Sequence, residues 1–138
     1  MVGLSKSRIT AYEQCPRRLW LEVHRRELAA VDEGSQSRLI AGDEVGEEAC
    51  RQRPGGILIS DELGLQAAIA ATRDAVVADR QRPIFEATFV HEGVLVRADI
   101  LEFVPSEGWH LTEVKSAGSV KAYHLGDIAT QAWVLEGN

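Results

Sequence analysis

The spacing of apolar residues predicts helices in the first half of the chain. Apolar positions recur every three to four residues along three stretches, which is the period of an amphipathic helix. These stretches are 8–28, 38–52 and 65–79. Pro16 lies inside the first stretch and predicts a kink or a break into two helices there, and Ser7 is a candidate N-cap. A polar loop over 32–37 separates the first two stretches, and Pro54-Gly55-Gly56 ends the second.

The second half of the chain changes to a period of two, which is typical of half-buried strands. Three stretches carry this period: 84–90, 94–104 and 109–115. Glu92-Gly93 and the run 105–108 predict turns between them, so we expect a three-stranded antiparallel meander. A short strand over 57–59 and a final helix beginning near Asp127 complete the pattern. The predicted fold class is therefore α+β, with the meander packed against flanking helices.

Length and composition narrow the class of protein. The 138 residues suit a single domain over 1–138. Hydrophobic residues make up 45% and charged residues 26%, which excludes disordered, collagen-like and disulfide-scaffold proteins. The sequence contains no apolar run that predicts a membrane span or a signal peptide, so we expect no membrane partner and a cytoplasmic location. Because the final helix stops soon after it begins, we expect a C-terminally incomplete domain, either part of a longer chain or completed by a homodimer.

The net charge of −6 hides an asymmetry along the chain. Residues 1–26 contain six basic and two acidic residues, whereas the remainder is strongly acidic. A basic helix on an acidic body suits a phosphate-binding edge beside a carboxylate site, with Arg17 and Arg18 as the phosphate contacts. The alternative is that both arginines lie on a solvated helix face.

Three charged residues on the predicted meander carry the candidate chemistry. Side chains alternate along a strand, so Glu113 and Lys115 share one face while Val114 points to the other. A hairpin turning near residue 106 brings Asp99 beside Glu113. Two neighbouring carboxylates repel unless a cation lies between them, and oxygen ligands suit Mg²⁺ or Mn²⁺. A lysine beside such a site can orient or deprotonate water and stabilise phosphate charge.

Other readings of these residues stay open at this point. Asp99 could instead pair with Arg97, and Glu113 with Lys115 could form an ion pair on a solvent face, where it would contribute little to stability. Glu86, on the first predicted strand, could also approach the site. The simplest role for the large apolar residues is core packing. The residues assigned to the core on this basis include Val77, Trp20, Trp109 and Trp133.

Together these positions resemble the PD-(D/E)XK nuclease superfamily, in particular its RecB-like branch. Asp99 followed by Glu113-Val114-Lys115 is similar to the D…(D/E)xK signature, and Gln131 is similar to the glutamine of the QxxxY motif. Ser5-Lys6-Ser7-Arg8 with Cys15-Pro16 resembles the start of CRISPR-associated RecB-like exonucleases and of related uncharacterised bacterial families. The segment 42–47 stands where those nucleases carry a GxxxH motif.

The resemblance implies a fold, a reaction and a set of roles. The fold would be a restriction-endonuclease-like PD-(D/E)XK core, and the reaction a Mg²⁺- or Mn²⁺-dependent hydrolysis of DNA in repair or defence, on single strands or ends. Asp99, Glu113 and Lys115 would be the catalytic residues. The metal would be held by Asp99, Glu113 and the Val114 carbonyl, and Gln131 would contact the scissile strand or steady the site.

The sequence departs from the family pattern at three positions. Gly46 replaces the histidine of GxxxH, so the first-helix metal ligand is either missing or supplied by Glu47 or Glu48. Leu135 replaces the tyrosine of QxxxY. Cys15 matches the first iron–sulfur cysteine of longer relatives, but no cysteine follows Cys50, so no 4Fe-4S cluster is expected in this chain. Two other functions are therefore kept: a catalytically inactive relative that binds nucleic acid or protein, and an α+β interaction domain with accidental motifs.

Overall fold

The computed structural model describes residues 3–29 and 33–138, except for the side chains of 33–36, 38, 39 and 63. The α-helices in this part of the chain are α1 (Lys6–Gln14), α2 (Pro16–His24), α3 (Glu33–Arg51), α4 (Leu65–Ala78) and α5 (Ala122–Glu136). The strands are β1 (Leu4–Ser5), β2 (Ile57–Leu58), β3 (Ile84–His91), β4 (Val94–Val104) and β5 (Gly108–Thr112). Short 3₁₀ turns lie at Arg26–Leu28 and Asp61–Leu63. The predicted α+β class is confirmed.

The strands form one mixed sheet, which differs from the purely antiparallel arrangement that we expected. β3 pairs with β4, and β4 with β5, in antiparallel register, whereas β1 lies parallel to β4 and β2 parallel to β3. The two parallel strands have only two residues each. Strands this short carry no alternating pattern, which is why hydrophobic periodicity did not predict a sheet of mixed direction.

The same edge of β4 carries two partners with a gap between them. β1 pairs with β4 at Val94 and Leu95, and β5 pairs with it from Ile100 to Val104. Asp99 lies in the interval between these two pairings. Neither β1 nor β5 pairs with β4 at Asp99.

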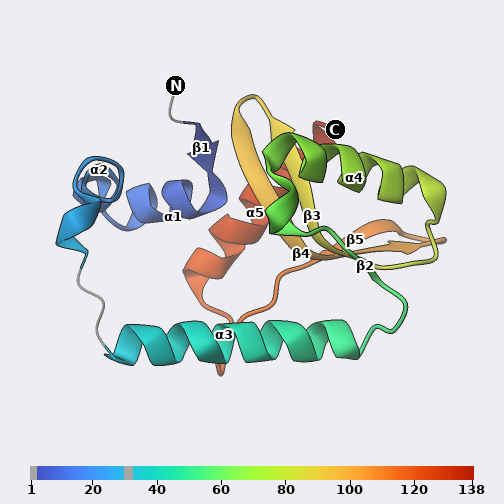
Figure 1. Ribbon diagram of the computed structural model, residues 1–138, viewed down its shortest axis with the longest axis horizontal. Helices are drawn as coiled ribbons and strands as arrows, with labels where there is room; N and C mark the ends of the chain where they lie inside the picture. Colours follow the sequence, from blue (N-terminus) through green and yellow to red (C-terminus); the bar gives the residue numbers. More distant parts are fainter. Residues whose placement is uncertain (1–2, 30–32) are drawn as a thin grey trace.

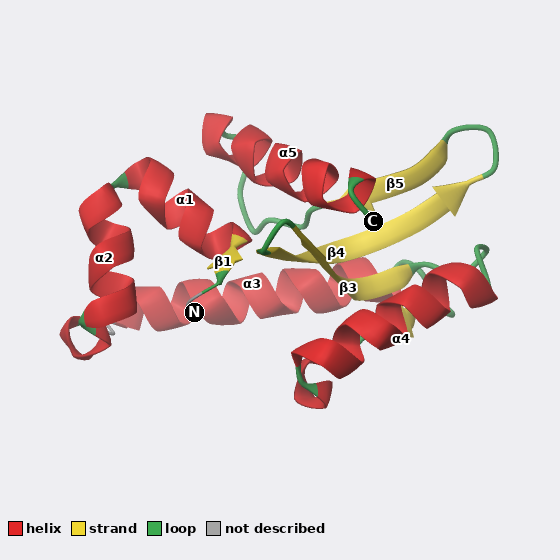
Figure 2. Cartoon of the chain, turned by 90° about the horizontal axis from the view of Figure 1, so that it is seen from above, coloured by secondary structure: helices red, strands yellow, loops and turns green. Residues whose placement is uncertain are grey.

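Helices cover both faces of the sheet (Figures 1 and 2). α4 and α5 lie on one face, and α3 runs across the opposite face. Small residues allow α4 to approach the sheet closely, since Ala68 and Ala75 of the helix pack with Ala87 and Ala98 of the strands. At the other end of the same face, Val134 of α5 packs against β4. The core therefore lies between the sheet and α4 with α5.

The first helical stretch behaves largely as the sequence predicts. Pro16 breaks it into α1 and α2 and occupies the first turn of α2, where a missing amide hydrogen costs nothing. The N-cap is Ser5 and not Ser7, because the hydroxyl of Ser5 accepts a hydrogen bond from the Arg8 amide. α3 begins at Glu33, so residues 33–37 of the expected loop are helical, and Asp32 lies outside the described residues.

The third predicted strand and the last helix have different limits from those expected. β5 ends at Thr112 and not at residue 115, so Glu113, Val114 and Lys115 follow the strand instead of belonging to it. α5 begins at Ala122, five residues before the predicted start.

Three of the residues assigned to the core are exposed. Val77 is 77% exposed, Trp20 53% and Trp133 42%. Trp109 is partly buried and packs against the main core cluster. No helix in the described ranges has the length and apolarity needed to cross a membrane.

Candidate functional site

The carboxylate of Glu113 is the centre of a polar cluster between the start of α1 and the middle of α5. Its Oε1 atom accepts hydrogen bonds from Lys6 Nζ at 2.8 Å and Lys115 Nζ at 2.5 Å, and its Oε2 atom accepts one from Gln131 Nε2 at 2.6 Å. Burial alone would raise the pKa of Glu113, but the hydrogen bonds from Lys115, Lys6 and Gln131 outweigh it and hold the pKa below its ordinary value. Glu113 is thus a buried, charged carboxylate with three donors.

Asp127 of α5 adds a second carboxylate to this cluster. Its Oδ2 atom lies 3.0 Å from Lys115 Nζ, and its Oδ1 atom lies 3.7 Å from Lys6 Nζ. Burial lowers the pKa of Lys115, but hydrogen bonds to Glu113 and Asp127 raise it more, so the pKa lies above its ordinary value. Lys115 is therefore held as an ammonium between two carboxylates.

Asp99 lies next to this cluster, in the gap along the edge of β4. Its Oδ2 atom accepts a hydrogen bond of 2.7 Å from the amide of Val114, the residue between Glu113 and Lys115. The contact lies just beyond the last pair of the β4–β5 ladder, Ile100 with Thr112. Burial raises the pKa of Asp99, the Val114 amide lowers it in part, and the charge of Glu113 raises it further, so the pKa lies above its ordinary value.

Glu86 faces Asp99 from the neighbouring strand. The pairs Phe85 with Ile100 and Ala87 with Ala98 lie on either side of Glu86 and Asp99, which are not themselves paired in the β3–β4 register. The backbone of Glu86 has φ = +58°, which is uncommon for a residue other than glycine. Burial raises the pKa of Glu86, and the charge of Asp99 raises it further. Two neighbouring carboxylates repel each other unless a cation lies between them.

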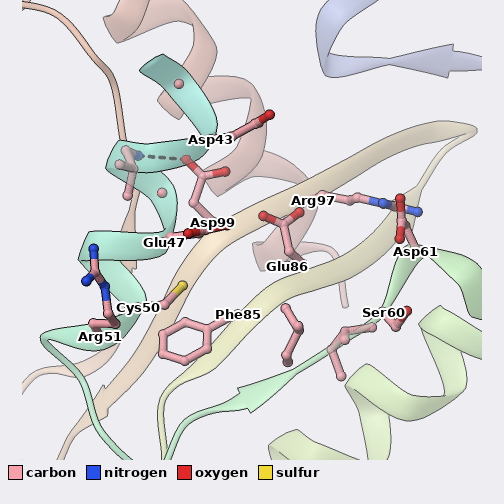
Figure 3. Close-up of a pocket in the computed structure, with 15 residues that line it drawn as sticks. Asp43, Glu47, Cys50, Arg51, Ser60, Asp61, Phe85, Glu86, Arg97 and Asp99 are labelled. Atoms are coloured by element: carbon pink, nitrogen blue, oxygen red, sulfur yellow. Dashed lines mark hydrogen bonds between the residues drawn. The ribbon is translucent and has the colours of Figure 1, made fainter. Parts of the chain in front are cut away.

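Both side chains face a cleft between the sheet and α3 (Figure 3). The cleft has a volume of about 880 Å³. Five carboxylates and two guanidinium groups line it. The carboxylates belong to Asp43, Glu47, Asp61, Glu86 and Asp99, and the guanidinium groups to Arg51 and Arg97. The walls are therefore acidic, which suits a cation and opposes an anion that arrives alone.

Some of the predicted metal-site residues line this cleft, and others do not. Asp99 and Val114 line the cleft, and Glu47 enters it from α3 (Figure 3). Glu113 lies behind Val114 with both of its oxygens engaged by protein donors. Arg97 extends away from Asp99 towards Asp61 in Figure 3, so the alternative pairing of Arg97 with Asp99 does not describe the site.

The residues predicted to contact phosphate lie apart from the cleft. Arg17 and Arg18 are exposed on α2, and neither lines the cleft. Arg18 Nε binds Glu22 of the same helix at 2.7 Å, which fits the solvated-face alternative for that residue. Cys15 is an exposed free cysteine.

The donor set agrees with a hard divalent cation, although the side chains do not form a closed cage. Among the side chains that the structure describes, no three from His, Cys, Asp or Glu are grouped so that they could hold a metal ion together. Asp99 has one oxygen that does not take part in its bond to Val114, and Glu86 lies near it on the neighbouring strand. Carboxylate oxygens facing solvent are the ligands that Mg²⁺ prefers, because this ion keeps several waters.

Two members of the polar cluster were missed from the sequence. Lys6 contacts Glu113 across 107 positions of the chain, and no local pattern predicts such a contact. Asp127 precedes Gln131 by one helical turn, so both point from the same face of α5. That spacing was a usable signal once Gln131 had been selected.

Comparison of the chain with known protein families, with curated proteins and with solved structures finds no match.

Proposed function

We propose that this chain is a divalent-metal-dependent deoxyribonuclease with a PD-(D/E)XK-like core of the RecB-like type. The observation that supports this most directly is the meeting of the motif residues. Asp99 binds the amide of Val114, Glu113 binds Lys115, and Gln131 binds Glu113. These residues come from β4, from the segment after β5 and from α5, so their proximity is a property of the fold.

The acidic cleft supports a reaction that needs a cation. Phosphodiesters are anions, and the walls of the cleft carry more carboxylates than guanidinium groups. A divalent cation would neutralise this charge, polarise the phosphate and lower the pKa of a bound water. Asp99 and Glu113 would hold it, and Glu86, Glu47 and the Val114 carbonyl are the neighbouring candidate ligands.

The chain's own residues would supply the remaining functions. The Lys115 ammonium, held by Glu113 and Asp127, can donate to a phosphate oxygen or orient a water. Gln131 is fully buried, so its bond to Glu113 fixes the orientation of that carboxylate. DNA, as single strands or ends, is the proposed substrate.

The test is cleavage of end-labelled single-stranded and duplex DNA with Mg²⁺, Mn²⁺ or EDTA. We expect metal-dependent cleavage by the wild type and its loss in Lys115→Gln and Asp99→Asn. Lys121→Gln is the matched control, because Lys121 is an exposed lysine outside the cluster. Equal cleavage by Lys115→Gln and the wild type would contradict the proposal, as would a wild type without metal-dependent activity.

Two observations favour a second candidate, an inactive relative that binds nucleic acid or protein. Gly46 supplies no side-chain ligand, and both oxygens of Glu113 are engaged by protein donors. The same assay separates the candidates when a gel-shift lane is added. DNA binding without metal-dependent cleavage would support the binding module and reject the nuclease.

A further inference from the structure

The carboxylate of Glu113 accepts more hydrogen bonds than it could retain while also binding a metal ion. Two ammonium groups and one amide occupy its two oxygens, and the two lysines share a single oxygen atom, Oε1. A divalent cation at Oε1 would be repelled by two ammonium groups within 3 Å of that atom. If Glu113 binds the cation of the proposed function, at least one lysine must therefore find another acceptor.

The neighbouring carboxylate, that of Asp127, has an oxygen atom that can accept a further hydrogen bond. Its side chain is 8% exposed, and its Oδ1 atom is buried with no hydrogen-bond partner among the described residues. A buried carboxylate oxygen without a donor is costly. The cost persists here although an ammonium group, that of Lys6, lies only 3.7 Å away.

The distances allow Lys6 to change acceptors with a small movement. Its Nζ lies 2.8 Å from Glu113 Oε1 and 3.7 Å from Asp127 Oδ1. An ordinary charged hydrogen bond measures about 2.8 Å, so the shift needed is about 1 Å. Lys6 is 20% exposed and lies on the first turn of α1, so a rotation of its long side chain suffices.

We propose that Asp127 is a positioning residue that accepts Lys6 when Glu113 binds the divalent cation, and that keeps Lys115 at the site in both states. The inference rests on the proposed nuclease function. Before the cation binds, Glu113 holds both lysines and Asp127 holds only Lys115. Afterwards Asp127 holds one lysine on each of its oxygens, and the buried Oδ1 gains its missing donor. The lysine charges therefore stay paired throughout.

The first test follows the lysine ammonium signals of Lys6 and Lys115 by ¹⁵N NMR in the wild type during titration with Mg²⁺. We expect the Lys6 signal to shift with metal and to stay protected from solvent exchange. Glu113→Gln imitates the cation-bound state without metal, because it removes the carboxylate charge that competes with Asp127 for Lys6. Both signals should persist in that variant and disappear in the double variant Glu113→Gln/Asp127→Asn. A Lys6 signal that ignores Mg²⁺, or that is lost in Glu113→Gln alone, would overturn the exchange.

The second test measures Mn²⁺ affinity by calorimetry. Asp127→Asn should weaken binding by roughly 10- to 100-fold, which is the usual effect of removing a residue that orients a metal ligand. Asp127→Glu should restore part of the loss, and Asp74→Asn, on an exposed site of α4, should leave affinity unchanged. If the wild type binds Mn²⁺ and Asp127→Asn binds it equally well, the exchange alone is wrong. If the wild type binds no Mn²⁺ and cleaves no DNA, the proposed function fails and the exchange with it.

Discussion

Replacing Glu113 by glutamine is the most informative single change to the stability of this chain. The substitution keeps the shape of the side chain and removes the charge that Lys6 and Lys115 contact at 2.8 and 2.5 Å. Glu113 is 8% exposed, and the two lysines are 20% and 37% exposed. In these ion pairs the Glu113 carboxylate is therefore largely buried, whereas the two lysine side chains are partly solvated.

The structure sets the size of the expected loss. Removing one partner of a fully buried pair costs about 3–5 kcal/mol, because the other charge stays buried without compensation. Here the lysines keep some solvent and Asp127 remains as an acceptor, so we expect the lower figure of about 2–3 kcal/mol. At roughly 4 °C per kcal/mol for a chain of this size, Tm should fall by about 8–12 °C at neutral pH.

The pH dependence gives an independent check on the cause. The pKa of Glu113 is held below its ordinary value of 4.5, so its contribution to stability is complete above that pH. As the pH falls through the lowered pKa, the wild-type carboxylate takes up a proton and its contribution disappears. The stability difference between the wild type and Glu113→Gln should therefore shrink progressively below pH 4.5.

The assay is thermal and urea unfolding followed by circular dichroism, with Glu48→Gln as the matched control. Glu48 makes an ion pair of 2.7 Å with Arg51, but the two side chains are 50% and 71% exposed. Such a pair contributes about 0–1 kcal/mol, so the control should be nearly neutral. A Glu113→Gln variant as stable as Glu48→Gln, or a deficit that does not change with pH, would refute the reasoning.

Three further predictions test the surroundings of the cluster. Glu86→Gln should raise Tm at neutral pH, because burial and the charge of Asp99 raise the pKa of Glu86. The gain in Tm should vanish below pH 4.5, where the wild-type carboxyl group is neutral. A Tm that is unchanged at pH 7 would contradict this prediction. Thr72→Val should cost about 1–3 kcal/mol in urea unfolding, because the Thr72 hydroxyl is the acceptor for the buried Thr88 amide, while Thr72→Ser should recover most of the loss. Gly46→His should tighten Mn²⁺ binding in calorimetry, because the residue lines the cleft and a Cβ there would meet no atom within 4 Å beyond its chain neighbours and its own helix backbone. Weaker binding would argue against a metal in this cleft.

The sequence by itself determined the elements whose cause is local. Alternating apolar residues predicted β4 with its observed limits, Val94 to Val104. The ring of Pro16 broke the first helix at the place where it removes a backbone donor. Asp99, Glu113, Lys115 and Gln131 could be selected because their residue types and spacing resemble a known motif. Periodicity and backbone chemistry act within a few residues, so one sequence is enough to read them.

Only the tertiary structure decided how distant segments meet. β1 and β2 have two residues each and carry no periodic signal, so their parallel pairing became visible only with the fold. The strand ends at Thr112, and the bond beyond it joins Asp99 of β4 to Val114, which follows β5. Lys6 lies 107 positions from Glu113 in the chain but within hydrogen-bond distance of it. The composition of a charge cluster depends on sheet register and helix placement, and these are fixed by packing of the whole domain.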